Sequence, residues 1–200
     1  PARVLPQDCD LGGVVQLTVR SSTNYGSGSR GTGFAVAQGI LTNAHMVASD
    51  GSDGSSDVVI VAPSGRPDGV FPSRFLVVDW AADLALVELP VDLPVTSIAP
   101  TAYVPQGSRV RIVGFPGPVR DIASMSQGIV SKVWDYGDGV VKILTDAAVN
   151  PGSSGSPIFA NDCTALGIVH ARHENPFTHV YGMGLGIGAE TIHDFLSQVQ

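Results

Sequence analysis

The chain has 200 residues, of which 44% are hydrophobic and 14% charged, with a formal net charge of −7. This length and apolar content suit one globular domain, or two small halves packed closely together. The acidic balance and the lack of a basic cluster argue against a nucleic-acid partner. No apolar run approaches the roughly 20 residues that span a bilayer, and no signal-peptide pattern opens the chain. We therefore expect membrane contact only through a segment outside this chain.

Short apolar stretches alternate with turn residues along the whole sequence. The 24 glycines and 14 prolines are spread evenly, and the stretches between them are rich in Val, Ile, Leu and aromatic residues. This pattern predicts many short strands joined by turns, and therefore an all-β sandwich or barrel. In chain order the expected strands are residues 14–19, 33–38, 58–61, 74–78, 84–89, 109–114, 128–134, 140–146, 157–160, 165–170 and 180–187.

Four segments depart from the strand pattern. Residues 21–31 and 49–57 are rich in Ser, Gly and Asp, which predicts surface turns. Residues 89–107 carry four prolines and indicate a connector between two β-halves. At the end of the chain, Ile192, Phe195, Leu196 and Val199 have helical spacing and predict an amphipathic helix. The expected divisions of a single domain 1–200 are two halves at 12–95 and 108–188, a connector at 96–107, and a helix at 189–200.

The two cysteines, Cys9 and Cys163, both lie in polar surroundings, QDCD and ANDCTA. Two interpretations stay open, a pair of unrelated buried thiols or one disulfide bond. A zinc site is not expected, because isolated cysteines lack the paired spacing of zinc ligands. We therefore predict no metal ligands.

The strongest chemical signal is the segment Asn150-Pro-Gly-Ser-Ser-Gly-Ser-Pro157. A nucleophilic serine needs an exposed hydroxyl on a tight turn, with amide N–H groups directed at the developing oxyanion. Of the three serines, only Ser154 has a glycine two residues before it and another immediately after it. We expect Ser154 to be the nucleophile, with an oxyanion hole in the backbone of Gly152, Ser153 and Ser154. The alternative is an ordinary turn rich in Gly and Ser.

Two further residues complete a pattern with Ser154. His45 follows an apolar stretch, and Asp83 opens another; taken singly, they would pass for a core histidine and a turn cap. A buried carboxylate needs a hydrogen-bond donor, and a histidine Nδ1–H is a suitable one. The order His, Asp, Ser is that of chymotrypsin-fold enzymes, whereas subtilisin-like enzymes and α/β-hydrolases use other orders. The hypothesis is that His45 is the general base and Asp83 orients it, in a cleft between the halves.

Three blocks of the sequence resemble the catalytic segments of HtrA/Deg-type trypsin-like serine proteases, namely residues 42–47, 83–86 and 145–157. Residues 31–34, 126–131 and 183–187 resemble flanking strands of the same family. The resemblance implies two antiparallel six-stranded β-barrels with a C-terminal α-helix. It also implies hydrolysis of polypeptide substrates through an acyl-enzyme, without a cofactor, and an extracytoplasmic location.

The resemblance also implies a substrate preference. It places the base of the primary specificity pocket at Ala148, which carries no charge, so we expect cleavage after small or medium apolar residues. His170 or Arg172 could instead give acidic specificity, and His170 also falls near the position where this fold approaches the triad aspartate. The alternatives are a processing protease with few targets, a membrane-tethered signalling protease, and a non-catalytic binding module. The expected pocket residues are Ala148, Val149, Val169, His170, Ala171, Arg172 and Leu185, with Ile187 nearby.

Overall fold

A computed structural model describes residues 9–21, 28–47, 57–64, 69–117, 123–135, 137–175 and 178–199. Most of the expected turn at 49–57 lies outside these residues. Of the expected turn at 21–31, residue 21 and residues 28–31 instead belong to two paired strands. The strands extend into this polar segment because backbone hydrogen bonds pair Arg20 with Gly28 and need no apolar side chain.

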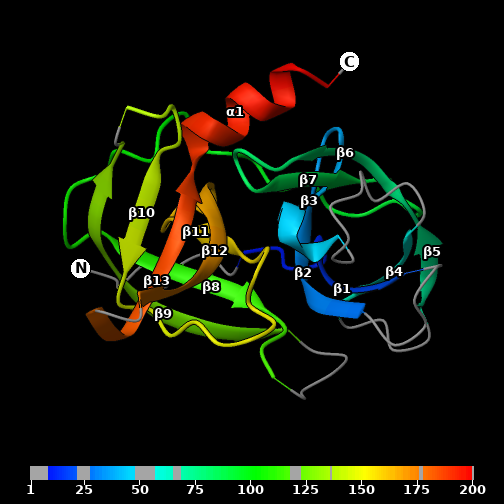
Figure 1. The fold of residues 1–200 in the computed structure, drawn as a ribbon, viewed down its shortest axis with the longest axis horizontal. Coiled ribbons are helices and arrows are strands. Elements are labelled where there is room, and N and C mark those ends of the chain that lie inside the picture. Colours follow the sequence, from blue (N-terminus) through cyan, green and yellow to red (C-terminus); the bar gives the residue numbers. More distant parts are fainter. Residues whose placement is uncertain are drawn as a thin grey trace, which may run out of the picture.

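Seven strands form the first half of the molecule (Figure 1). They are β1 (Val14–Ser21), β2 (Gly28–Val36), β3 (Gly39–Thr42), β4 (Asp57–Pro63), β5 (Phe71–Ser73), β6 (Phe75–Asp79) and β7 (Leu84–Val87). Their order in the sheet is β5-β4-β1-β2-β3-β7-β6, with antiparallel pairing throughout. The two edge strands, β5 and β6, are separated in the chain by Arg74 alone. Among the described residues, β5 pairs with β4 and β6 pairs with β7, and no hydrogen-bonded ladder joins these two edges. The first half is therefore a curled sheet rather than the expected closed six-stranded barrel.

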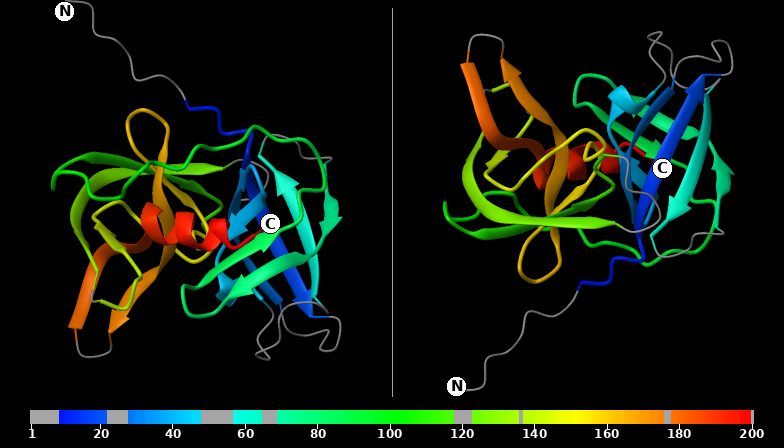
Figure 2. Two further views of the ribbon diagram at one scale, coloured as in Figure 1. Left: turned by 90° about the horizontal axis from the view of Figure 1, so that it is seen from above. Right: turned by 90° about the horizontal axis from the view of Figure 1, so that it is seen from below.

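Six strands form a closed antiparallel barrel in the second half. They are β8 (Arg109–Gly114), β9 (Ser124–Trp134), β10 (Lys142–Thr145), β11 (Pro157–Phe159), β12 (Ala165–Asn175) and β13 (Thr178–Gly188). Helix α1 (Ala189–Ser197) follows, and Figure 2 shows it lying beside the barrel and extending towards the first sheet. The expected all-β class and the terminal helix are confirmed. No helix among the described residues is long and apolar enough to cross a membrane.

One apolar cluster joins the two halves and the helix. Leu41 and Leu86 of the first sheet share this cluster with Phe159 and Ile168 of the barrel and with Phe195 of α1, all almost fully buried. Burying one such side chain contributes about 1.5–3 kcal/mol, so the shared core resists separation of the halves. A site at their junction is therefore held by packing from both sides.

Candidate active site

His45 and Asp83 lie close together because the strands beside them pair. His45 sits on a 3-10 turn, η1 (Ala44–Met46), just after β3, and Asp83 immediately precedes β7. Strands β3 and β7 are antiparallel neighbours, with Thr42 opposite Ala85. The Nδ1 atom of His45 is 2.8 Å from Asp83 Oδ2, and the His45 backbone N–H donates to Asp83 Oδ1 at 2.8 Å. The carboxylate thus holds both the ring and the backbone of this histidine.

The backbone at Asp83 has an unusual conformation. Its φ angle is 53°, in the left-handed region that residues other than glycine rarely adopt. The buried side chain of Asn43 donates from Nδ2 to the Asp83 carbonyl oxygen at 3.1 Å. The paired strands on either side and this hydrogen bond together hold Asp83 in that conformation.

A second histidine contacts the same carboxylate. His170, on β12, places Nδ1 2.5 Å from Asp83 Oδ2, and its ring meets that of His45 edge-on with centroids 5.9 Å apart. Burial alone would raise the pKa of Asp83, but hydrogen bonds from His170 and then His45 outweigh it and lower the pKa to about 2. Asp83 is therefore ionised at neutral pH, with two imidazoles bound to it. The sequence pointed to proximity between His170 and Asp83 but gave no sign of this direct bond.

Ser154 comes from the loop between β10 and β11. Two glycines shape this loop, Gly152 with φ +96° and Gly155 with φ +84°. A Cβ on Gly155 would lie 1.8 Å from the Thr32 carbonyl oxygen, so only glycine fits there. The half-buried Ser154 side chain donates from Oγ to the His170 carbonyl oxygen at 3.4 Å, rather than to His45. Catalytic hydrogen bonds are often long or differently aligned before a substrate binds.

The backbone around Ser154 offers N–H groups of two kinds. The N–H of Ser153 donates to the Asn150 carbonyl oxygen at 2.9 Å and so closes the turn. The N–H groups of Gly152 and Ser154 have no acceptor among the residues that the structure describes. Of the three residues expected at the oxyanion hole, these two are available as donors, whereas Ser153 serves the turn.

Thr32 connects the nucleophile loop to the first sheet. Its Oγ1 donates to the Gly152 carbonyl oxygen at 2.9 Å and accepts the Phe115 N–H at 3.0 Å. Its own N–H donates to the Ser154 carbonyl oxygen at 2.8 Å. Sequence reasoning missed this role, because residues 31–34 were singled out only by family resemblance. A buried threonine between two glycines was the available signal.

The residues expected around the specificity pocket differ in burial and in surroundings. Val169 is buried and Val149 partly buried in one apolar cluster, and Leu185 is half-buried on β13. Ala148 is exposed and lines a pocket of 170 Å³ between the nucleophile loop and strands β8 and β9. The side chain of His170 is bound to Asp83, as described above. The side chains of Ala171 and Arg172 lie outside the described part of the molecule.

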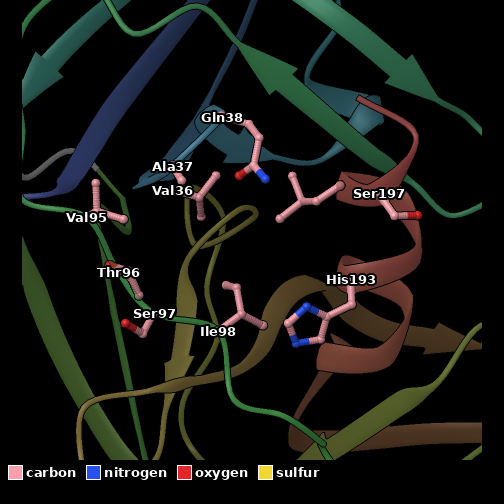
Figure 3. Close-up of a pocket in the computed structure, with 10 residues that line it drawn as sticks. Val36, Ala37, Gln38, Val95, Thr96, Ser97, Ile98, His193 and Ser197 are labelled. Atoms are coloured by element: carbon pink, nitrogen blue, oxygen red, sulfur yellow. The ribbon is translucent and has the colours of Figure 1, made fainter. Parts of the chain in front are cut away.

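A larger pocket, of 490 Å³, lies elsewhere (Figure 3). Its walls are the β2–β3 turn, the connector around Thr96 and the outer face of α1, where His193 and Ser197 are labelled. None of His45, Asp83 and Ser154 lines it. Pocket size therefore does not identify the candidate active site, which is defined by hydrogen bonding.

Of the two interpretations left open for the cysteines, the structure supports the disulfide bond, which joins Cys9 and Cys163 with a Cα–Cα distance of 5.4 Å. It ties the N-terminal segment to the turn after β11. Arg111 Nη2 lies 3.0 Å from the Cys9 sulfur. No metal ligands were expected from the sequence; among the described residues, His45, Asp83 and His170 bring potential ligand atoms within 4.8 Å of one another.

Comparisons with known proteins agree with this geometry. The family model for the trypsin-like peptidase domain matches residues 31–168. The chain is 27% identical over 184 residues to putative protease Do-like 13 of Arabidopsis thaliana, covering 86% of this chain and 35% of that protein. It is 32% identical over 146 residues to a probable periplasmic serine endoprotease DegP-like of Pseudomonas fulva, covering 70% of this chain and 28% of that protein.

A third relative, serine protease HTRA2, mitochondrial, of Bos taurus, is 30% identical and covers 84% of this chain and 36% of its own length. The chain thus spans about a third of the length of these curated relatives. The crystal structure of Rv3671c protease in an inactive form matches with a TM-score of 0.71 and 22% identity, over 95% of this chain and 90% of that one, which supports the fold. The chain belongs to the trypsin-like peptidase domain family and is similar to proteins named as HtrA- and DegP-type serine proteases.

Proposed function

We propose that this chain hydrolyses peptide bonds with Ser154 as nucleophile, His45 as general base and Asp83 as the residue that orients His45. One observation carries the proposal, the 2.8 Å contact between His45 Nδ1 and Asp83 Oδ2. With its Nδ1 proton held by the carboxylate, His45 keeps Nε2 free of a proton. Nε2 is then the atom that accepts the hydroxyl proton of Ser154.

The reaction proceeds in two halves. Ser154 Oγ attacks the scissile carbonyl carbon as its proton passes to His45, and the resulting imidazolium protonates the leaving amine. Water then hydrolyses the acyl-enzyme with the same histidine as base. The N–H groups of Gly152 and Ser154 stabilise the tetrahedral oxyanion. Before the first step, the Ser154 hydroxyl must give up its hydrogen bond to the His170 carbonyl oxygen, at 3.4 Å, and donate to His45 Nε2 instead.

The substrate is proposed to be exposed or unfolded polypeptide with a small or medium apolar residue before the scissile bond. The support is the uncharged, exposed Ala148 at the expected pocket base and the apolar cluster that contains Val149 and Val169. A charged side chain would lose hydration there without gaining a partner. An extracytoplasmic location is proposed as well, since the Cys9–Cys163 disulfide persists in oxidising compartments, and one relative is named periplasmic.

Labelling with a fluorophosphonate probe, together with peptide hydrolysis, tests the chemistry. Ser154→Ala is expected to abolish labelling and to lower kcat by roughly four to six orders of magnitude, because the triad acts as a unit. The matched control is Ser153→Ala, because the Ser153 side chain has no place in the mechanism. Its kcat is expected to fall by only a few-fold, and its labelling should be retained. Loss of labelling in Ser153→Ala but not in Ser154→Ala would overturn the assignment.

Cleavage-site profiling on a denatured proteome digest tests the substrate preference. We expect Val, Ala, Ile, Leu or Met before the scissile bond, with loose discrimination, since one methylene changes selection by only about 1–3 kcal/mol. A dominant Glu or Arg at that position would contradict the apolar pocket. Cleavage confined to a very few sequences would instead favour a processing protease.

A further inference from the structure

Three side chains, those of His45, Asp83 and His170, bring atoms that can bind a metal close together. The Nδ1 atoms of His45 and His170 lie 2.8 Å and 2.5 Å from the same carboxylate oxygen, Oδ2. One ligand atom from each of the three residues lies within 4.8 Å of the other two. The side chains of the two histidines are 41% and 30% exposed, so the group can be reached from solvent.

We propose that His45, Asp83 and His170 form a binding site for Zn²⁺ that reversibly inhibits the enzyme. Two imidazole nitrogens and one carboxylate oxygen are ligands that zinc prefers, and zinc sites with three protein ligands keep a fourth position for water. At zinc–ligand distances of about 2.0–2.1 Å, tetrahedral ligands lie about 3.3 Å apart. The present contacts of 2.5 Å and 2.8 Å would therefore have to widen by less than about 1 Å.

The net charge of the chain and the types of ligand atom both bear on which ion binds. The formal net charge, −7, favours the approach of a cation. Mg²⁺ is a poor competitor, because it prefers oxygen ligands in octahedral geometry.

Inhibition follows from the position of a proton, and this step depends on the proposed function. Zinc bound at His45 Nδ1 displaces the proton from that atom, and a neutral imidazole then carries its proton on Nε2. That nitrogen can no longer accept the proton of Ser154. The substrate-binding surface is not occupied by the metal. Zinc should therefore lower kcat and leave KM nearly unchanged.

Binding is tested first without any activity, in the Ser154→Ala protein after treatment with EDTA and dialysis. Isothermal titration with zinc chloride is expected to show one ion per chain, and zinc should raise Tm by mass action. His170→Asn in the same background keeps a donor for Asp83 but loses the nitrogen ligand. We expect its zinc affinity to fall by more than the roughly 10–100-fold that an outer-shell substitution costs.

The control variant is His193→Asn in the same background, which removes an exposed histidine of α1 that lies outside the group. It should bind zinc like Ser154→Ala. Visible absorption of bound Co²⁺ provides a second measurement, since a tetrahedral site gives intense bands that a variant with a lost ligand does not. Zinc binding of equal strength in the His170→Asn protein, or no binding of either metal in the Ser154→Ala protein, would overturn the site.

Inhibition is then measured on the otherwise unchanged enzyme with a peptide substrate. Zinc chloride should reduce kcat, magnesium chloride should have no effect, and EDTA should restore the rate. The remaining activity of His170→Asn should be far less sensitive to zinc than that of His193→Asn. An effect of zinc confined to KM would contradict the proton argument, even if the titration shows binding. An inactive wild-type protein that still binds zinc would refute the proposed function and leave the metal site standing.

Discussion

His45 and Asp83 come from the first sheet, whereas Ser154 and His170 come from the closed barrel. The two halves hold their residues by different means. In the first sheet, the fully buried and paired strands β3 and β7 place His45 and Asp83, which are joined by side-chain hydrogen bonding. In the barrel, a loop with two glycines of positive φ places the nucleophile mainly through its backbone. Substitutions in the first half should therefore alter protonation, and substitutions in the nucleophile loop should alter conformation.

Among substitutions that separate the two regions in this way, the largest effect is expected from Asp83→Asn. An amide can donate to His45 Nδ1 and so favours the tautomer that carries its proton on Nε2, which cannot act as base. We expect kcat to fall about 10,000-fold at neutral pH. Tm should fall by only several degrees, which matches the loss of the roughly 2 kcal/mol that the charge on Asp83 contributes. Steady-state kinetics beside a thermal melt separates the two effects. A variant with kcat within ten-fold of wild type would show that Asp83 does not orient His45.

Gly155→Ala should act on conformation instead. The new Cβ would lie 1.8 Å from the Thr32 carbonyl oxygen at a φ of +84°, so we expect a loss of about 3–5 kcal/mol in the free energy of unfolding. Gly137→Ala is the matched control, because Gly137 has φ +86° but nothing within 4 Å of its added Cβ. It should lose only the roughly 1–2 kcal/mol of a left-handed backbone. Equal losses from chemical denaturation of the two variants would show that the close approach to Thr32 is not limiting.

The same contrast explains which features the sequence could predict. The order of His45, Asp83 and Ser154 and the glycines around Ser154 are local patterns, and they led to the correct family and fold class. The strand pattern located most elements within a few residues. It could not foresee that β5 and β6 are separate edges, because the break at Arg74 is a property of pairing with two different neighbours.

Features that depend on contacts between distant segments were not predictable in the same way. The bond from His170 to Asp83 joins residues 87 positions apart, and the bond from Thr32 to Gly152 joins residues 120 apart. The two glycines that flank Thr32 are the one local signal for either bond. The use of the Ser153 N–H inside the turn depends on the exact loop conformation, which the spacing of glycines does not determine.

Thr32→Val tests the contact that joins the two regions. Valine keeps the volume but removes the acceptor of the buried Phe115 N–H and the donor to the Gly152 carbonyl oxygen. We expect about 2–3 kcal/mol less stability, since an unsatisfied buried group loses its full desolvation cost, and a fall in kcat as the oxyanion loop loosens. Thr32→Ser keeps the hydroxyl and should recover most of both losses in denaturation and rate measurements. If Thr32→Ser were as impaired as Thr32→Val, the methyl group rather than the hydroxyl would be the important part.

The smallest effect concerns the charge on Asp83. Its pKa is lowered to about 2 in the folded protein, against about 3.9 in an unfolded chain. A lowered carboxylate pKa stabilises the fold above the unfolded value, and that stabilisation, about 2 kcal/mol here, is lost as pH falls from about 4 through 2. His170→Ala removes the larger of the two lowering hydrogen bonds, so the variant should be less stable than wild type at pH 7 and approach it near pH 2.

Urea denaturation at a series of pH values measures that difference. Thr32→Val is the control, because neither of its lost hydrogen bonds involves a titratable group, and its deficit should stay constant with pH. The rate measurements sharpen the comparison further. If His170 acts through the carboxylate, His170→Asn, which retains a donor, should recover more of both kcat and acid stability than His170→Ala. The loss of unfolding free energy in His170→Ala could instead be as large near pH 2 as at pH 7. That result would mean that His170 contributes by packing against the His45 ring. The charge on Asp83 would then be set by the first sheet, without help from the barrel.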